Sequence, residues 1–318
     1  MDIKTVVALV KISRPIHWSK NLAIFAGIVF SGMLLEENLL LLTFYGFIIF
    51  SLATSSTYSL NDALDHKSDR LHPIKRKRPV ASGELSVSSA LIWSLVTALT
   101  ALYLAWSLNY LFFLMVATYL ILQILYSLYL KRVHILDILI IASGFVIRIY
   151  SGAFLINAHL SVWFLLCVLS VALFLASGKR RAELSVAEPA KTRKSLQRYP
   201  KDLLNAYVAM FGNAAWLSWA LFTFFESPPS PTPVWLFLSQ FSRTITVNKL
   251  LMVTIPVSIF AIMRYQGLIF QDKSEAPEKV FLTDIPLILS ILVWGAGVII
   301  TLYGGARPSS LFQTLPPL

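Results

Sequence analysis

Nine long apolar segments dominate the sequence and restrict its fold more than any other feature. They lie near residues 17–35, 39–59, 87–106, 110–130, 136–156, 160–177, 203–225, 249–270 and 285–303. Each has roughly the 20 apolar residues that an α-helix needs to cross the hydrocarbon core of a bilayer. Strands that span a membrane are about half as long and alternate in polarity. The segments therefore predict an all-α polytopic membrane protein with nine transmembrane helices.

Composition excludes most other classes of protein. Hydrophobic residues make up 57% of the chain and charged residues only 14%, against about 45–50% and about 25% in soluble domains. The single cysteine, Cys167, excludes a disulfide scaffold. The 27 Lys and Arg residues outnumber 16 Asp and Glu residues, for a net charge of +11. Because the loops are too short for a nucleic-acid-binding domain, this charge indicates anionic lipid or a phosphorylated substrate as the partner.

The distribution of positive charge predicts the orientation in the membrane. The N-terminal residues through Lys20 and the loops after the second, fourth, sixth and eighth apolar segments contain 22 of the 27 Lys and Arg residues. Loops rich in Lys and Arg stay on the cytoplasmic side. We therefore expect an integral protein of the cell (inner) membrane, with its N-terminus and active site cytoplasmic and its C-terminus outside.

The first candidate site follows the second apolar segment. Asn61, Asp62, Asp65 and Asp69 come at its end, and the three aspartates are spaced three and four residues apart. On a helix this spacing places them on one face, where like charges repel one another. A divalent cation would relieve the repulsion, and hard oxygen ligands suit Mg²⁺. The alternative is a solvated loop that its own lysines neutralise.

Two basic stretches accompany the aspartates. Lys75 and Arg78 belong to a run of four cations just beyond them, and such side chains hold phosphates directly. A second stretch, with Lys179, Arg180 and Glu183, follows the sixth apolar segment. It predicts a cationic site for a phosphate carried by a lipid. The alternative is a patch that binds lipid headgroups or sets the topology.

Arg148 lies inside the fifth apolar segment. A buried arginine in a span costs at least about 2.5–3.5 kcal/mol on insertion scales, so it must pair or bind something. Asp137 is eleven residues away on the same expected helix, about three turns distant. A pair within the helix is therefore disfavoured, and we expect Arg148 to face a polar cavity. The segment from Ser13 to Asn21 reads as an interfacial anchor with Trp18 at headgroup depth.

The aspartate segment resembles a known family. Asn61-Asp62-x-x-Asp65-x-x-x-Asp69, the basic run after it, the stretch from Tyr126 to Lys131 and the nine-span count are similar to the UbiA superfamily of intramembrane prenyltransferases. The resemblance implies one domain over residues 1–318, with helices around a cytoplasm-facing polar cavity. It also implies cap loops near residues 61–86 and 178–202, Mg²⁺ as cofactor and a homo-oligomer, specifically a trimer.

The sequence departs from the superfamily pattern after the sixth segment. Typical members carry a second aspartate cluster there, which helps a second Mg²⁺ hold a prenyl diphosphate. This chain has Lys179, Arg180 and Arg181 with Glu183 instead. A prenyl monophosphate can be held by Lys and Arg alone. The stretch resembles the decaprenyl-phosphate phosphoribosyltransferase branch, in which polyprenyl phosphate is the acceptor and 5-phosphoribosyl 1-diphosphate is the donor.

The resemblance implies a role for each matching residue. Asn61 and Asp65 would be the main Mg²⁺ contacts, and Asp62 and Asp69 would support them. Lys75 and Arg78 would hold the phosphates of the donor, and Glu183 would orient the cations beside it. The remaining implied contacts surround the lipid phosphate or the reacting centre: Lys20, Tyr58, Tyr126, Lys131, Arg148, Lys179 and Arg180. Asn61, Asp65 and Arg148 are the residues implied in catalysis.

Two alternative functions stay open at this point. One is a conventional enzyme that moves a prenyl group from a diphosphate to an aromatic or lipid acceptor, for which only Glu183 and Glu188 could supply the second acidic cluster. The other is a lipid-binding or transport protein without catalysis. Transporters usually have polar or broken helices at the midplane, whereas the third, sixth and ninth segments contain no Asp, Glu, Lys or Arg.

Overall fold

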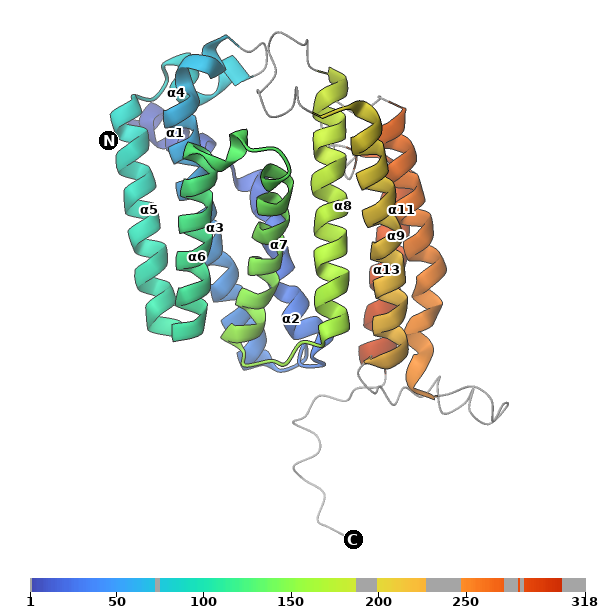
Figure 1. Ribbon diagram of the computed structural model, residues 1–318. Coiled ribbons are helices and arrows are strands. Elements are labelled where there is room, and N and C mark those ends of the chain that lie inside the picture. The colour runs from blue at the N-terminus through green and yellow to red at the C-terminus, as the bar shows by residue number, and fades with distance from the viewer. Residues whose placement is uncertain are drawn as a thin grey trace, which may run out of the picture. The chain divides into compact units, whose positions relative to one another are not determined.

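The computed structural model describes residues 2–71, 75–186, 199–226, 247–271, 280 and 283–304, and this part of the chain is helical without strands (Figure 1). Eight of its helices are long and apolar enough to cross a membrane, which agrees with an all-α integral membrane protein. They are α3 (Glu37–Arg70), α5 (Val87–Leu108), α6 (Tyr110–Leu128), α7 (Leu136–Leu155), α8 (Val162–Val186), α9 (Lys201–Phe225), α11 (Ile255–Phe270), which the 3₁₀ helix η6 (Val247–Thr254) precedes, and α13 (Ile285–Tyr303).

The first expected span differs from the prediction. Residues 17–35 do not form one long helix: α1 (Ile3–Ser13) is followed by the 3₁₀ helix η1 (Pro15–Ile24) and the short α2 (Phe25–Phe30). Arg14 adopts a left-handed backbone conformation between α1 and η1, with φ of 49°. Pro15 has no N–H to donate and disfavours helical backbone in the residue before it. The described residues therefore contain eight long spans where hydropathy predicts nine.

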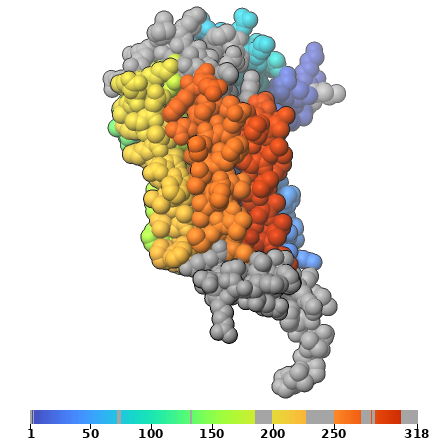
Figure 2. Space-filling model, turned by 90° about the vertical axis from the view of Figure 1, so that its right-hand side faces the viewer, coloured from blue at the N-terminus to red at the C-terminus, as the bar shows by residue number. Residues whose placement is uncertain are grey.

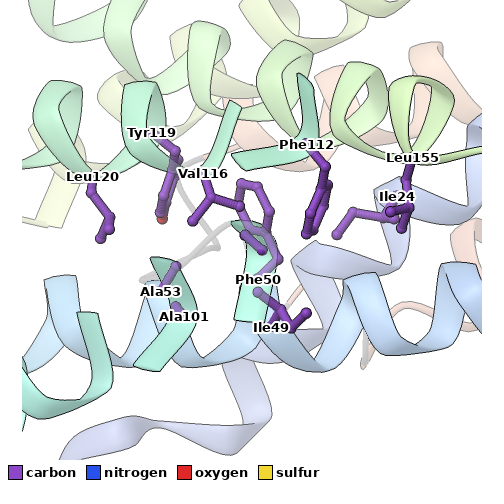
Figure 3. Packing of buried hydrophobic residues seen from close by; sticks show 11 residues of the cluster. Ile24, Ile49, Phe50, Ala53, Ala101, Phe112, Val116, Tyr119, Leu120 and Leu155 are labelled. Atoms are coloured by element: carbon purple, nitrogen blue, oxygen red, sulfur yellow. The ribbon is translucent and has the colours of Figure 1, made fainter. Parts of the chain in front are cut away.

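The chain divides into two compact units. The first comprises Met1–Gly27, Leu41–Ile140 and Ile147–Ala158, and the second comprises Ile28–Leu40, Ile141–Val146 and His159–Leu318. Figure 3 shows the core of the first unit, in which aromatic and aliphatic side chains from η1, α3, α5, α6 and α7 pack together. Its buried members are Ile24, Ile49, Phe50, Ala53, Ala101, Ala105, Phe112, Val116, Tyr119, Leu120 and Leu155.

Helix α1 packs against one end of the first unit, next to α4 (Pro79–Ser82) and the start of α5 (Figure 1). Its buried face, with Ala8 and Ile12, joins a cluster that includes Ala63 of α3 and Val80 of α4. The opposite face leaves valines exposed, as expected for an amphipathic helix at a membrane surface. The packing holds α1 over the end of α3 that carries the aspartates.

The second unit is built from α8, α9, α11 and α13, and Figure 2 shows α9, α11 and α13 side by side on one face. Asp284 caps α13, since its side chain accepts a hydrogen bond from the Leu287 N–H at 3.0 Å. Arg264 of α11 donates two further hydrogen bonds to the Asp284 carboxylate, at 3.0 and 2.7 Å. These bonds hold the pKa of Asp284 below its ordinary value.

The expected cap loops begin as helix. Residues 61–70 continue α3, and residues 178–186 continue α8, so both motifs lie on the last turns of spanning helices. Residues 72–74 and 187–198, and with them Glu188, lie outside the described residues. Hydropathy places the end of a predicted span at its last apolar residue. Both helices continue past that point, because backbone hydrogen bonds do not require apolar side chains.

Candidate active site

A polar stripe runs along α3 toward the aspartates. Ser51, Thr54, Ser55 and Ser59 are buried, and each hydroxyl donates to the carbonyl one turn earlier at 2.7–2.9 Å. Hydroxyl side chains can satisfy their donors in this way within a single helix. The helix therefore carries a polar face through an apolar environment, and that face leads to Asn61.

Asp62 and Asp69 lie two turns apart on α3 and are held by arginines. The Asp62 side chain is 1% exposed, and its Oδ1 accepts from Arg14 Nη2 at 2.5 Å and from Arg78 Nη1 at 3.3 Å. Asp69 Oδ2 accepts from the same Arg78 Nη1 at 2.6 Å. The result is a chain of alternating charges, Arg14–Asp62–Arg78–Asp69, which connects the α1–η1 junction, α3 and the start of α4.

Asp65 is separate from this chain of charges. Its side chain is 25% exposed, and Lys131 Nζ donates to both carboxylate oxygens, at 2.7 and 3.0 Å. Lys131 belongs to η3 (Leu130–Arg132), so the structure brings together two residues that the sequence assigned to one site. Asn61 lies one turn before Asp65, and its Oδ1 is buried with no hydrogen-bond partner in the described part of the chain.

The arrangement limits how the site could hold a metal. No group of three His, Cys, Asp or Glu residues in the described ranges converges on one point. The repulsion between the aspartates, which suggested a divalent cation, is relieved by Arg14, Arg78 and Lys131. Asn61 Oδ1 and the Asp65 carboxylate are still hard oxygen donors one turn apart. They fit a Mg²⁺ that takes the rest of its ligands from water and substrate phosphates.

Further predicted residues surround this end of the first unit. The guanidinium of Arg14 lies 4.8 Å from the centre of the Tyr58 ring, and the His17 ring is 5.5 Å from that ring. A cation over an aromatic face is a stabilising contact. The other predicted residues of this unit lie on separate elements: Lys20 on η1, Lys75 on η2 (Lys75–Lys77) and Tyr126, which is buried, on α6.

Arg148 occupies a different place from the aspartates. It is 6% exposed, and it donates from Nε to Asn21 Oδ1 at 2.7 Å and from Nη2 to the Tyr119 hydroxyl at 3.0 Å. Asn21 in turn contacts Ser51 at 3.0 Å and Thr54 at 3.3 Å. Thr54 precedes Asn61 by seven residues, about 10 Å along the helix. Arg148 thus lies in a polar network inside the first unit, with partners from η1 and α6.

The second basic stretch belongs to the second unit. Lys179, Arg180 and Glu183 lie on the last turns of α8, and Arg180 forms an ion pair with Glu183. Arg181 is 2% exposed and donates from Nε to Asn205 Oδ1 of α9 at 2.7 Å. A Cβ atom at Gly178 would come within 2.7 Å of the Ile269 side chain, so glycine is what lets α8 approach α11 this closely.

The structure adds residues that sequence reasoning did not place in a site. Arg14 and Asn21 belonged to the expected interfacial anchor, yet both reach into the first unit. Trp18 of the same segment donates its indole N–H to the Ser13 carbonyl at 3.2 Å and to Ser55 Oγ at 3.1 Å. The signal that could have found these contacts is the run of serines and threonines in the second apolar segment, whose hydroxyl oxygens remain able to accept hydrogen bonds from polar neighbours.

Comparison with known proteins supports the resemblance. The model of the UbiA prenyltransferase family matches residues 21–179. The chain is 34% identical over 295 residues to the decaprenyl-phosphate phosphoribosyltransferase of Mycolicibacterium smegmatis, covering 91% of this chain and 90% of that protein. It is 32% identical over 299 residues to the protein of the same name from Mycobacterium tuberculosis H37Rv, covering 92% and 93%.

Solved structures show the same fold at low sequence identity. A UbiA homolog from Archaeoglobus fulgidus bound to GPP and Mg²⁺ matches with a TM-score of 0.64 at 17% identity, over 93% of this chain and 99% of that one. A digeranylgeranylglyceryl phosphate synthase matches with a TM-score of 0.63 at 14% identity, over 95% and 100%. These likenesses concern the arrangement of helices and not the substrate.

Proposed function

Since the chain belongs to the UbiA prenyltransferase family, we propose that it transfers the 5-phosphoribosyl group of 5-phosphoribosyl 1-diphosphate to a polyprenyl phosphate. Relatives named decaprenyl-phosphate phosphoribosyltransferase align over nine-tenths of both chains, which supports this choice within the family. The observation that carries the proposal is the end of α8, where Lys179, Arg180 and Arg181 stand with the single acid Glu183. This composition suits a lipid monophosphate better than a second metal-bound diphosphate.

The reaction is a displacement at C1 of the ribose. An oxygen of the lipid phosphate forms a bond to C1, the bond from C1 to the diphosphate breaks, and diphosphate leaves with the electron pair. The lipid phosphate is already anionic at neutral pH, so no general base is required. The protein then contributes by positioning the two substrates and by stabilising the departing charge. The attack proceeds with inversion at C1.

The first unit supplies the donor side of the proposed site. Asn61 and Asp65 would hold Mg²⁺, which would neutralise the leaving diphosphate when bound. Lys131, whose Nζ lies 2.7 Å from Asp65 Oδ1, would contact phosphate oxygens at the reacting centre. Lys75 and Arg78 would hold the remaining phosphates. Lys20, Tyr58 and Tyr126 of this unit would line the path of the lipid phosphate.

The decisive experiment offers competing substrates to one preparation. Purified protein with Mg²⁺ is incubated with labelled 5-phosphoribosyl 1-diphosphate and decaprenyl phosphate. In parallel it is incubated with a prenyl diphosphate and an aromatic acceptor. We expect labelled lipid only in the first reaction, and EDTA should abolish it. Prenylation of the aromatic acceptor without phosphoribosyl transfer would overturn the proposal in favour of conventional prenyl transfer.

A variant set separates the two enzyme functions further. Replacing both Lys179 and Arg180 by Gln removes two charge-assisted contacts of about 1.5–3 kcal/mol each. Acceptor affinity should therefore fall about a hundredfold or more, while the Mg²⁺ requirement stays unchanged. Arg264→Gln, which removes a cation from α11 of the same unit, is the matched control. A Glu183→Gln variant whose Mg²⁺ requirement rises sharply would instead support a second metal site and prenyl transfer.

A further inference from the structure

Arg14 and Asp62 form a contact that the proposed reaction does not use. Arg14 joins α1 to η1 in a left-handed conformation, with φ of 49° and ψ of 62°. Residues other than glycine rarely adopt this backbone conformation. Pro15 follows, and the Ser13 carbonyl before it accepts hydrogen bonds from Trp18 and Ser55, so the backbone is held on both sides. The guanidinium reaches across the Tyr58 ring to Asp62.

Asp62 forms ion pairs with two arginines. Its Oδ1 accepts from Arg14 at 2.5 Å and from Arg78 at 3.3 Å, and the side chain is almost completely buried. A buried carboxylate is costly unless cations and hydrogen bonds compensate it. Asp65, one turn further on, is instead partly exposed and paired with a lysine. The two aspartates therefore have different surroundings despite belonging to one sequence motif.

The hydrogen bonds of Arg78 indicate what the contact between Asp62 and the two arginines does. Asp62 and Asp69 both accept from Nη1 of Arg78, at 3.3 and 2.6 Å. In the described ranges, the hydrogen bonds of its guanidinium all come from this one nitrogen, and the side chain is about a quarter exposed. Nε and Nη2 form the other edge of the guanidinium. Such an edge of a guanidinium can bind a phosphate with two parallel hydrogen bonds.

We propose that Asp62 is a positioning residue: with Arg14 it fixes the orientation of Arg78 toward the phosphates of the donor, and it is not a ligand of the metal. The proposal rests on the proposed function for the identity of the donor. It divides the aspartate motif into Asn61 and Asp65, which would face the metal, and Asp62 and Asp69, which hold the arginine. It also gives the left-handed backbone at Arg14 a role, because this residue must reach Asp62 of α3.

Binding of the metal is measured without turnover. Free Mn²⁺ is followed by electron paramagnetic resonance in the presence of inorganic diphosphate and the intact protein. Asp62→Asn keeps the size of the side chain and one acceptor oxygen, and it should leave Mn²⁺ affinity within about twofold of the original. Asp65→Asn should weaken it about tenfold or more. Asp62 Oδ2 is buried without a hydrogen-bond partner in the described residues, so an equal loss in both variants would identify Asp62 as a ligand and overturn the proposal.

Kinetics test whether Asp62 acts through Arg78. Asp62→Asn and Arg14→Gln should each raise KM for the donor about tenfold, with little change in KM for the acceptor. In an Arg78→Gln background, Asp62→Asn should add less than twofold, because the residue it positions is gone. Multiplicative effects of Asp62→Asn and Arg78→Gln would contradict the proposal. So would an unchanged donor KM in Arg14→Gln, a variant that leaves every carboxylate in place.

The matched control removes an ion pair of α1 that does not involve Arg14, Asp62 or Arg78. Lys11 of α1 pairs with Glu84 at 3.0 Å, and both side chains are about half exposed. Glu84→Gln should leave donor KM and Mn²⁺ affinity unchanged, because exposed ion pairs contribute little. If the unaltered protein used a prenyl diphosphate instead of the phosphoribosyl donor, the proposed function would fail. The Mn²⁺–diphosphate measurement would still decide the role of Asp62.

Discussion

Single buried charges in the first unit are stabilised by partners far away in the sequence. Arg148 illustrates this, since its donors reach Asn21 and Tyr119 and its guanidinium lies 4.8 Å from the Tyr119 ring and 5.5 Å from the Phe50 ring. Aromatic faces and neutral acceptors lower the cost of a buried cation in a membrane protein. The contacts favour a role in holding η1 in place, through which Arg148 would act on the site.

Replacing Arg148 tests this role. Arg148→Leu removes the buried charge, but it leaves Asn21 and Tyr119 with unmet hydrogen bonds at about 1–3 kcal/mol. We expect a lower melting temperature together with reduced transfer activity. Unfolding can be followed with a thiol-reactive dye, because Cys167 is the chain's single cysteine and is buried.

Tyr119→Phe is the milder companion variant, since it removes only the hydroxyl that accepts from Arg148. Its melting temperature should fall by less than that of Arg148→Leu, in line with a single hydrogen bond of about 1 kcal/mol. A stable but inactive Arg148→Leu protein would contradict the positioning role and return Arg148 to direct contact with substrate.

Elements of the first unit approach one another closely where glycines allow it. Gly152 of α7 faces the end of η1, and a Cβ atom there would overlap the carbonyl of Ile24. Gly27 of α2 makes the matching approach, since its Cβ would lie 2.9 Å from the backbone nitrogen of Ala153. The two glycines thus leave room for η1 and α2, which replace the first expected span, to pack against α7.

Gly152→Ala should therefore destabilise the protein. A methyl group cannot share space with a backbone carbonyl, and overpacking of this kind typically costs about 1–3 kcal/mol. The melting temperature measured through Cys167 should fall. Gly267→Ala is the control, because a Cβ atom at Gly267 would meet nothing within 4 Å. Equal behaviour of the two variants would show that η1 does not lie against α7.

The start of α13 offers a test at the level of a helix end. Asp284→Ala removes both the cap and the pair with Arg264, whereas Asp284→Asn retains an acceptor for the Leu287 N–H. Loss of an N-cap costs about 1 kcal/mol, so Ala should lower the melting temperature more than Asn. Identical melting temperatures would rule out the cap as a source of stability.

The same residue predicts a dependence on pH. The folded-state pKa of Asp284 is lowered, chiefly by the hydrogen bonds of Arg264. Its contribution is therefore complete above the ordinary carboxyl pKa, and it is lost as the pH falls through the lowered value. The difference in melting temperature between the original protein and Asp284→Asn should be constant near neutral pH and shrink in acid.

At the scale of the whole molecule, the distribution of charge makes a prediction about topology. In a Cys167→Ser background, Arg76→Cys and Ser107→Cys place thiols at exposed positions before α5 and on its last turn. The positive-inside rule predicts position 76 in the cytoplasm and position 107 outside. An impermeant maleimide should label position 107 in intact cells and position 76 only after permeabilisation. The reverse pattern would invert the proposed orientation.

Local properties of the sequence determined the helices and the aspartate motif. Apolar runs predicted α5, α6, α7 and α13 to within two residues at each end. This prediction is possible because the hydropathy and the length of a segment can be read directly from consecutive residues. The spacing of Asp62, Asp65 and Asp69 predicted a shared face on condition that the segment is helical, and the structure shows that it is the end of α3. The pair between Lys131 and Asp65 was not predicted, since the family resemblance implied only that Lys131 lies near the lipid phosphate or the reacting centre.

Only the tertiary structure decided which charges meet. Asp62 pairs with Arg14 across 48 positions of sequence, and Arg148 meets Asn21 across 127. Such contacts depend on how helices pack, and no local pattern records the packing. The division of residues 17–35 between η1 and α2 also needed the structure, because an apolar segment of the right length predicts a span whether or not its helix is continuous. Three aspartates that look equivalent along α3 therefore separate into two environments, since Asp62 and Asp69 share Arg78 whereas Asp65 pairs with Lys131.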